Sequence, residues 1–405
     1  MLVRIEANVL VPGRGAPIDD GVVVLDGSAI SFAGPSADAP ETPDATVVTA
    51  PAVMPGLWDC HTHLMGGTSL DLSRMPLEPL ALRAIRAGGD LRAALDAGVT
   101  SVREMGGLGV HLARAVDEGV IDGPSIYGAG AILSTTGGHG DLHSYPLAWV
   151  HEMHECRLCD GPDECAKAAR EQLRLNARVI KVCASGGVLS EIDDPIHQQF
   201  TVAELRAIVE VAGLADRVVA AHCHGKPGIM AAIEAGVRTI EHGTYLDEEA
   251  AAAMRETGAI LVPTRTIVED IRTSRAAPPF AQAKLDAIAD IHRGAVALAH
   301  DTGVRVAMGT DLALRAGGGP GAWGRNGREL PLLEECGFTP IEAIEAATAS
   351  GPDTLGPQAP RSGQLRAGYD ADVITLDVNP LNDLSVFLKT EHITGVWRSG
   401  RRVKG

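Results

Sequence analysis

The stretch VMPGLWDCHTH, residues 53–63, combines a short apolar run with two histidines placed directly after it. The apolar residues Val53 to Leu57 predict a buried β-strand. Side chains two positions apart in an extended chain point to the same side, so His61 and His63 are expected to project together. Two imidazoles in this arrangement could share one metal ion. The stretch therefore predicts a strand whose carboxyl end carries candidate metal ligands.

The middle of the chain repeats this pattern, with short apolar runs alternating with alanine-rich helical segments. One helical segment opens with TVAE, residues 201–204, which is a capping box followed by an apolar stripe. Alternating strands and helices are typical of a parallel sheet, and eight βα units in about 300 residues predict an α/β fold, a (β/α)8 TIM barrel. The predicted strands are Val53 to Leu57, Val99 to Arg103, Ser125 to Tyr127, Val179 to Val182, Val218 to Ala221, Thr239 to Glu241, Ile260 to Val262 and Arg305 to Met308.

The two ends of the chain have a different character. Residues 22–25 form a compact β-branched run between the turn dipeptides Asp20-Gly21 and Asp26-Gly27, and residues 371–376 and 395–398 are also strand-like. We therefore predict a small discontinuous β-sandwich domain formed by residues 1–52 and 364–405, with the barrel formed by residues 53–363.

Charge and composition exclude several classes of partner. The 405 residues include 52 acidic and 35 basic ones, a formal net charge of −17, and only four Trp, four Tyr and five Phe. Such a chain repels phosphate backbones and anionic lipids, which argues against nucleic-acid and membrane partners. No apolar run approaches the roughly 18 residues that a bilayer requires, and residues 1–11 lack the apolar segment of a secretory signal. We expect a cytoplasmic homo-oligomer with a small-molecule substrate.

Seven cysteines, an odd number in a chain long enough to fold without disulfides, predict reduced thiols. One local cluster of ligand-type residues consists of His151, His154, Cys156, Cys159 and Cys165. Its Cys-x-x-Cys step can suit zinc, but the usual second ligand pair at about 12 to 20 residues is missing. The favoured interpretation is a polar loop before a helix, with a structural metal as the alternative.

Polar residues gather where the predicted strands end, which is where barrel enzymes carry their chemistry. Lys181 lies inside the apolar run of the fourth strand, where an unpaired ammonium must be neutralised or ligated. A lone histidine is more often a satisfied polar residue than a ligand, but several ligand types at successive strand ends are hard to assign to packing. Their joint placement predicts a metal site. These residues are His61, His63, Lys181, His222, His242 and Asp311.

With these motifs the chain resembles the amidohydrolase superfamily, and within it the prolidase-like and imidazolonepropionase-related branch. The likeness extends over essentially the whole length. It rests on MPGLWDCHTH at 54–63 in the first strand, IKVCASGG at 180–187 in the fourth, and AHCHG at 221–225, TIEHG at 239–243 and GTD at 309–311 in the fifth, sixth and eighth. Together these motifs are specific, whereas His-x-His alone is weak.

The resemblance implies a binuclear metal centre, with zinc as the expected metal. By position, the more buried ion would be held by His61, His63 and Asp311. The other ion would be held by His222 and His242. Lys181, carboxylated by carbon dioxide, would bridge the two ions. A carbamate turns a disfavoured buried cation into an anionic oxygen ligand. The alternative for Lys181 is a snorkelling or salt-bridged lysine.

The resemblance also implies a mechanism. Two ions would hold a water between them and lower its pKa, so that metal-bridged hydroxide attacks a polarised carbonyl. Asp311 is the implied general base, which passes the proton to the leaving nitrogen. His139, in TGGHG at 136–140, resembles the family's substrate-side histidine and would stabilise the oxyanion; a loop histidine could equally be an ordinary surface residue. His224 is expected to contact the substrate, although some relatives carry tyrosine there.

Arginines after the last two strands are candidates for gripping a substrate carboxylate, although most surface arginines have no such role. They are Arg265 after the seventh strand and Arg315, Arg325 and Arg328 after the eighth. The resemblance favours hydrolysis of the C–N bond of a dipeptide or an N-acyl amino acid, as in a dipeptidase- or carboxypeptidase-like amidohydrolase.

Other functions stay open. Relatives also open carbamates, phenylureas or mycotoxin amides. A cyclic-imine deaminase would use one metal ion, but deaminases often lack the strand-four lysine and add a glutamate near the fifth-strand histidine, where this chain has Cys223 and His224. A non-catalytic scaffold would have lost ligands that are all present here. Neither a P-loop nor a G-x-S-x-G motif occurs.

Overall fold

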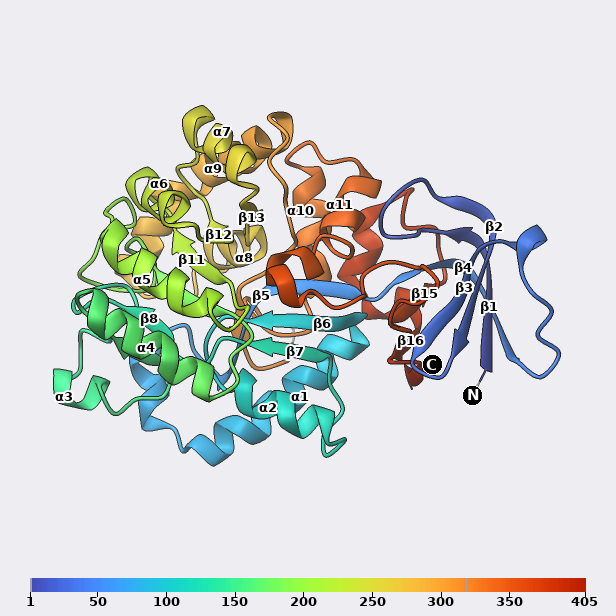
Figure 1. Cartoon of the computed structure of the whole chain (residues 1–405), viewed down its shortest axis with the longest axis horizontal. Helices are drawn as coiled ribbons and strands as arrows, with labels where there is room; N and C mark the ends of the chain where they lie inside the picture. The colour runs from blue at the N-terminus through green and yellow to red at the C-terminus, as the bar shows by residue number, and fades with distance from the viewer. Residues whose placement is uncertain (1, 318) are drawn as a thin grey trace.

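The computed structural model describes residues 2–317 and 319–405 (Figure 1). In this view strands surrounded by helices occupy the left, and a sheet built from both ends of the chain occupies the right. The blue strands β1 to β4 and the red strands β15 and β16 lie together. The fold is therefore α/β, a (β/α)8 barrel with a small discontinuous β-sandwich domain, which confirms the predicted fold class. The residue limits of the two domains stay a prediction.

The terminal domain contains a seven-stranded sheet in the order β17-β16-β15-β4-β1-β2-β3. Neighbouring strands run antiparallel, except that β1 and β4 are parallel. Its strands are β1 (Leu2–Leu10), β2 (Ile18–Asp26), β3 (Ala29–Pro35), β4 (Thr46–Pro55), β15 (Val373–Leu376), β16 (Ile393–Arg398) and β17 (Arg401–Lys404). The buried side chains of Ile5, Val23, Val373 and Trp397 belong to one apolar cluster, so strands from both ends of the chain share a core.

One of the two predicted turns of this domain is wrong. Gly27, with φ of +57°, turns the chain from β2 into β3 as expected. Gly21, in contrast, lies inside β2 and pairs with Ala7 of β1. The sheet continues through this position because a glycine leaves room for Leu10, whose Cβ would lie 2.3 Å from a Cβ at residue 21.

The barrel strands form two parallel sheets, of six and four strands, in the orders β13-β12-β11-β10-β8-β9 and β14-β5-β6-β7. Strands β10 to β13 are buried along their whole length, as expected for strands covered on both faces. The bounds are β5 (Leu57–Gly67), β6 (Val99–Glu104), β7 (Ser125–Gly128), β8 (Ile132–Ser134), β9 (Cys156–Leu158), β10 (Ile180–Cys183), β11 (Val219–Cys223), β12 (Thr239–His242), β13 (Ile260–Val262) and β14 (Leu312–Leu314).

Backbone hydrogen bonds bridge the two barrel sheets on both sides. The predicted eighth strand, Arg305 to Met308, is not a full strand but makes a single bridge between Val306 and Leu261. Its last residue accepts a hydrogen bond from Cys60 N, which connects β13 to β5 through this segment. On the other side, Arg178 N donates to the carbonyl of Gly128 at the end of β7.

The first predicted strand, Val53 to Leu57, is in fact divided between the two domains. Strand β4 ends at Pro55 in the terminal sheet, and β5 begins at Leu57 in the barrel. Gly56 lies between them, and a Cβ there would meet the side chain of Thr100 at 2.1 Å. The chain passes from one domain to the other at this residue because only a glycine fits against Thr100.

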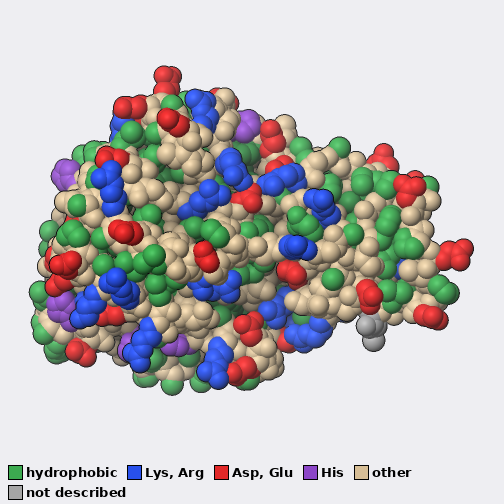
Figure 2. Space-filling view, viewed as in Figure 1, with side chains coloured by type: hydrophobic (Ala, Val, Ile, Leu, Met, Phe, Trp, Pro, Cys, Tyr) green, Lys and Arg blue, Asp and Glu red, His purple; other side chains and the backbone are tan. Residues whose placement is uncertain are grey.

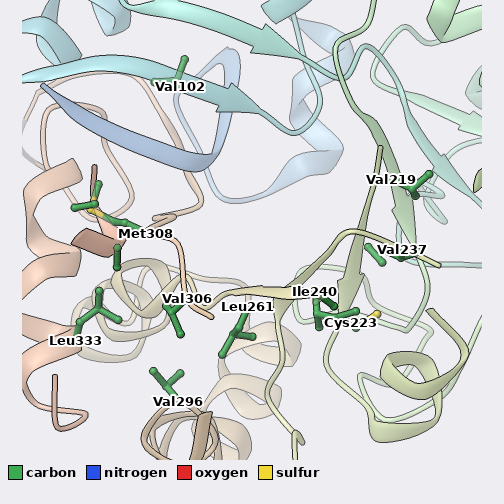
Figure 3. Close-up of a cluster of buried hydrophobic side chains, with 14 of the residues drawn as sticks. Val102, Val219, Cys223, Val237, Ile240, Leu261, Val296, Val306, Met308 and Leu333 are labelled. Carbon is green, nitrogen blue, oxygen red and sulfur yellow. The ribbon is translucent and has the colours of Figure 1, made fainter. Parts of the chain in front are cut away.

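Helices cover the outside of the barrel. Thr201 forms the predicted capping box with Glu204 at the start of α5. Figure 3 shows Leu261 of β13 and Val306 near Val296 of α9, part of one large apolar cluster between strands and helices. The α-helices are α1 (Leu80–Asp96), α2 (Gly109–Asp117), α3 (Leu147–Val150), α4 (Pro162–Arg174), α5 (Val202–Gly213), α6 (Lys226–Ala235), α7 (Glu248–Thr257), α8 (Arg265–Ser274), α9 (Pro279–Asp301), α10 (Glu329–Glu334) and α11 (Pro340–Ala346). Short 3-10 turns are η1 (Ser36–Asp38), η2 (Leu72–Leu77), η3 (Asn326–Arg328), η4 (Pro352–Gln358), η5 (Leu384–Leu388) and η6 (Thr390–His392).

The surface mixes both signs of charge. Acidic and basic side chains are interspersed over the face seen in Figure 2, with apolar side chains between them. Among the helices of the described residues, none is both long and apolar enough to cross a bilayer.

Candidate metal centre

Ligand-type side chains from distant parts of the chain meet at the carboxyl ends of the barrel strands. They line one cavity of about 150 Å³. The residues are His61 and His63 of β5, Lys181 of β10, His222 of β11, His242 of β12, and Asp311, which directly precedes β14. All except Asp311 are buried. The structure thus brings together all six residues that the sequence singles out as metal ligands.

The first group of candidate ligands consists of His61, His63 and Asp311, whose ligand atoms lie within 4.8 Å of one another. Asp311 Oδ1 is 3.2 Å from His63 Nε2 and 3.6 Å from His61 Nε2. Burial alone would raise the pKa of Asp311, but His61 and His63 lower this pKa to about 2. The Asp311 backbone has a φ of +60°, a conformation that is uncommon for non-glycine residues.

The second group consists of His222, His224 and His242, again with ligand atoms within 4.8 Å. The rings of His224 and His242 are stacked at 4.8 Å, and His222 meets both edge-on. Burial lowers the pKa of each of the three, so the imidazoles are neutral, which is the form that binds a metal. His224 lines the cavity beside the ligand pair, where the sequence predicts a substrate contact.

Lys181 lies next to the first group, with Nζ 3.4 Å from His61 Nε2. It is 2 % exposed, and burial is the main cause that lowers its pKa. Within the described part of the chain no carboxylate forms a salt bridge with it. A buried lysine without an ion-pair partner is therefore present among the ligand-type residues.

Three of the candidate histidine ligands are oriented by a partner at Nδ1, an arrangement typical of metal-binding histidines. His61 Nδ1 lies 2.7 Å from Glu241 Oε2, and His63 Nδ1 lies 2.8 Å from the carbonyl of Gly106. His242 Nδ1 lies 2.7 Å from the Thr264 hydroxyl. These contacts leave Nε2 of these three rings for the cavity, whereas His222 Nε2 lies 3.1 Å from the carbonyl of Gly186, which leaves its Nδ1.

Two of these supporting groups escaped the sequence interpretation. Glu241 accepts a hydrogen bond from Arg103 Nη2 at 2.6 Å. Burial alone would raise the pKa of Glu241, but Arg103 and then His61 lower this pKa to about 2. Glu241 could have been found from its place directly before a strand-end histidine inside a buried run. No local pattern marks Arg103 as a supporting residue, because its partner Glu241 is 138 positions away.

Asp59 anchors the turn that carries Asp311, and it too was missed. Its carboxylate accepts hydrogen bonds from the Thr310 hydroxyl at 2.5 Å and from Asn326 Nδ2 at 2.8 Å. The backbone N–H groups of Thr310 and His61 also donate to it. One buried carboxylate therefore ties β5 to the segment before β14.

His139 lies at the side of the cavity. Its ring stacks on His222 at a centroid distance of 4.2 Å, and its Nδ1 is 2.7 Å from the Ser190 hydroxyl. Burial lowers the pKa of His139 to about 4, so the ring is neutral at pH 7. The structure thus places it beside the candidate metal ligands, and its role stays a prediction.

The structure does not bring the predicted arginines to the cavity. Arg265 opens α8 and directs its guanidinium to Glu269 Oε1 at 2.5 Å and the carbonyl of Ala289 at 3.2 Å. Arg315 is exposed. Arg325 and Arg328 bind Asp270. None of these four belongs to the described residues that line the cavity.

The cluster that includes Cys159 and Cys165 does not gather as ligands. The two sulfurs lie 3.6 Å apart, and all seven cysteines are unpaired and buried. Of the described residues, two groups could hold a metal ion, and neither includes any member of this cluster.

The rest of the cavity wall is apolar. Side chains from β5, the following segment, the β10–α5 loop, α8 and α9 surround the space beyond the histidines. They include Met65, Leu70, Met75, Leu142, Val188, Ile267, Val268, Ile271 and Leu285. The site therefore combines a polar floor of ligand-type residues with mainly apolar walls.

Comparisons with known proteins agree with this site. Residues 52–403 match the model of the amidohydrolase family. Ochratoxinase of Aspergillus niger is 42% identical over 99% of this chain and 86% of its own length, and the imidazolonepropionase of Streptomyces griseus is 27% identical over 96% and 95%.

Solved structures give the same result. The crystal structure of A. niger ochratoxinase superposes with a TM-score of 0.93 at 40% identity, over 100% of this chain and 96% of that chain. A prolidase complexed with N-methylphosphonate-L-proline gives a TM-score of 0.90 at 32% identity over 100% of both chains. This chain therefore belongs to the amidohydrolase family, and it is an enzyme that hydrolyses amide C–N bonds.

Proposed function

We propose that this chain is a binuclear metal-dependent hydrolase that cleaves the amide bond of an N-acyl amino acid or a dipeptide. The observation that carries the proposal is the meeting of four histidines, an aspartate and a buried lysine in one cavity, where this lysine forms no salt bridge with any described residue. His61, His63 and Asp311 would hold one divalent ion, expected to be zinc. His222 and His242 would hold the other.

The donor set fits such a pair of ions. His61, His222 and His242 are neutral and Asp311 is ionised, and one ring nitrogen of each ligand histidine is already engaged by a supporting group. Lys181 fits as a bridging carbamate, because burial favours its neutral amine and a carbamate would supply the negative charge that this position lacks. When bound, two divalent ions lower the pKa of a water molecule and polarise the substrate carbonyl.

Asp311 and His139 would act on the reacting atoms. The Asp311 carboxylate, ionised at neutral pH, accepts the proton of the attacking water and delivers it to the leaving nitrogen. This role requires the tautomer in which the Ser190 hydroxyl donates to Nδ1 of His139, so that the proton of the neutral ring is on Nε2. Nε2–H then donates to the substrate oxygen as negative charge develops on it.

The cavity favours an uncharged acyl group. Glu155, the one acidic residue besides Asp311 among the described lining residues, is paired with Arg83 at 2.5 Å. The free α-ammonium of a dipeptide would lose its water against apolar walls and neutral histidines, at a cost of several kcal/mol. We therefore favour N-acyl amino acids over dipeptides.

An ochratoxin-type amide is the second candidate. It is supported by the 42% identity to ochratoxinase along nearly the whole chain. The apolar lining of the cavity suits a substrate with apolar groups.

Metal analysis combined with a matched pair of substrates tests the proposal. We expect about two ions per chain and loss of activity with a chelator. 3-Phenylpropanoyl-L-phenylalanine and L-phenylalanyl-L-phenylalanine differ only in the α-ammonium group, and we expect kcat/KM to be at least about tenfold higher for the first.

Other outcomes point to the alternatives. One ion per chain together with ammonia release from cyclic imines would indicate a deaminase. An absence of bound metal would indicate a scaffold. Equal rates on the two substrates would contradict the preference for an uncharged acyl group while leaving the metal centre in place.

A further inference from the structure

The loop between β10 and α5, residues 184–201, is held from outside the cavity by Lys284 of α9. Its ammonium donates hydrogen bonds to three backbone carbonyls of this loop. Nζ lies 3.1 Å from the oxygen of Gly187 and 2.7 Å from that of Ser190, and the third acceptor is the carbonyl of Asp193. An ammonium group has three N–H donors, so all three are used on one short segment.

The carboxylate of Asp193 completes this arrangement. Its Oδ1 lies 3.5 Å from Lys284 Nζ, and its Oδ2 accepts hydrogen bonds from Gly187 N and Gln199 Nε2, each at 3.0 Å. The Asp193 side chain is 6 % exposed and that of Lys284 is 19 % exposed. The positive charge is therefore neutralised locally, and both ends of the loop are tied to one carboxylate.

The same loop forms the slot that holds His139. Ser190 Oγ is 2.7 Å from His139 Nδ1, and Gln199 Oε1 accepts a hydrogen bond from His139 N at 3.0 Å. A Cβ at Gly187 would lie 2.1 Å from the His139 ring, so the ring packs directly on the bare backbone of this glycine. The ring also stacks on His222.

We propose that Lys284 is a positioning residue, which sets the orientation of the His139 ring by fixing residues 187–193 from outside the cavity. This inference rests on the proposed role of His139 as the donor to the substrate oxygen. It assigns a catalytic consequence to a lysine that does not line the cavity itself. A small displacement of a group that must contact the reacting oxygen is enough to slow the reaction about a hundredfold.

The first test is Lys284→Met, which keeps the length of the side chain and removes its charge and donors. We expect kcat on 3-phenylpropanoyl-L-phenylalanine to fall about ten- to a hundredfold, more than KM rises, with metal content unchanged. Lys404→Met is the matched control, because Lys404 Nζ also donates to two backbone carbonyls, those of Asp96 at the end of α1 and of Thr390, and Lys404 does not line the cavity. It should keep kcat within about twofold.

A double-variant cycle separates positioning from a general structural effect. His139→Ala alone should lower kcat about a hundredfold or more. If Lys284 acts through His139, adding Lys284→Met to His139→Ala should change kcat less than about twofold further. A full additional loss in the His139→Ala background would overturn the inference, and so would a Lys284→Met variant with unchanged kcat.

Restoring the charge provides a further check. All seven native cysteines are buried, so Lys284→Cys introduces the accessible thiol, and alkylation with 2-bromoethylamine rebuilds an ammonium at this position. We expect Lys284→Cys to lower kcat and to speed amide hydrogen exchange in residues 184–201, and alkylation to reverse both effects. If alkylation slows the exchange but kcat does not recover, the proposal is contradicted.

These outcomes also separate the inference from the proposed function. If His139→Ala keeps full kcat, the role of His139 in the proposed function fails, and with it this inference. If His139→Ala is impaired but Lys284→Met is not, the inference alone fails.

Discussion

Lys181 combines burial with the absence of a salt-bridge partner among the described residues, which an ordinary cationic lysine does not tolerate. We expect Lys181→Ala to lower kcat more than about a hundredfold and to reduce the metal content below two ions per chain. The matched control Lys389→Ala removes an exposed lysine of the terminal domain and should change neither.

A carbon-13 NMR spectrum recorded with labelled bicarbonate adds a direct readout. A carbamate resonance should be present in the parent protein and absent from Lys181→Ala. Retention of two ions by the variant would refute the bridging assignment.

At the level of residues, the sequence was sufficient for side chains that bind directly and insufficient for those that support them. His61 and His63 could be found because the strand period places them together, and Lys181 because its flanks are apolar. Arg103 and Lys284 could not, since their partners lie far away in the sequence and meet them only after folding. Arg265 misled because it follows a strand, whereas its side chain turns towards α9.

At the level of elements, the joint between β4 and β5 depends on the absence of a side chain at Gly56. We expect Gly56→Ala to destabilise the protein by about 1–3 kcal/mol, because its Cβ would overlap Thr100 inside the junction. Urea unfolding followed by circular dichroism measures this.

Gly89→Ala provides the opposite control for this prediction. Gly89 lies inside α1, and a Cβ at this position would have nothing within 4 Å of it. Alanine there should stabilise the helix by about 0.5–1 kcal/mol. If Gly56→Ala is as stable as the parent, the junction is not tight.

Most of the elements could be predicted from apolar runs, but their limits depended on tertiary contacts. The run from Val53 to Leu57 is continuous in hydrophobicity, so nothing local indicates that Gly56 divides it between two sheets. The eighth strand was expected over Arg305 to Met308, where the chain is extended yet forms only the bridge of Val306 with Leu261. Register between distant strands is set by packing, which a local pattern does not contain.

At the level of the whole molecule, Asp372 lies where the terminal sheet meets the barrel. Its backbone carbonyl accepts from Gly56 N, and its carboxylate accepts from Ser399 N at 2.7 Å. Burial raises the pKa of this carboxyl to about 7. The folded state therefore holds a proton that the unfolded chain releases near pH 4, and the stability that this group contributes falls as the pH rises from about 4 to about 7.

We expect Asp372→Asn to remove this pH-dependent loss of stability, because asparagine does not ionise. Its amide oxygen can still accept the hydrogen bond from Ser399 N. The variant should be more stable than the parent at pH 8 by about 2–4 kcal/mol, and the difference should shrink towards pH 5. Thermal unfolding at pH 5, 6.5 and 8 tests this, and a difference that does not change with pH would contradict it.

The overall architecture could be predicted because the alternation of strands and helices and the β character of both ends are global patterns. The assembly state, the compartment and the domain limits stay predictions, because surface composition alone does not determine them.

The pairing of β4 with β15 has a consequence for how the protein is made. Translation releases β4, which ends at Pro55, about 300 residues before its neighbour β15, which begins at Val373. Until β15 is made, one edge of β4 exposes unpaired backbone N–H and C=O groups beside apolar side chains. Such an edge can pair with another nascent chain. We therefore expect this edge of β4 to need shielding during translation until β15 docks.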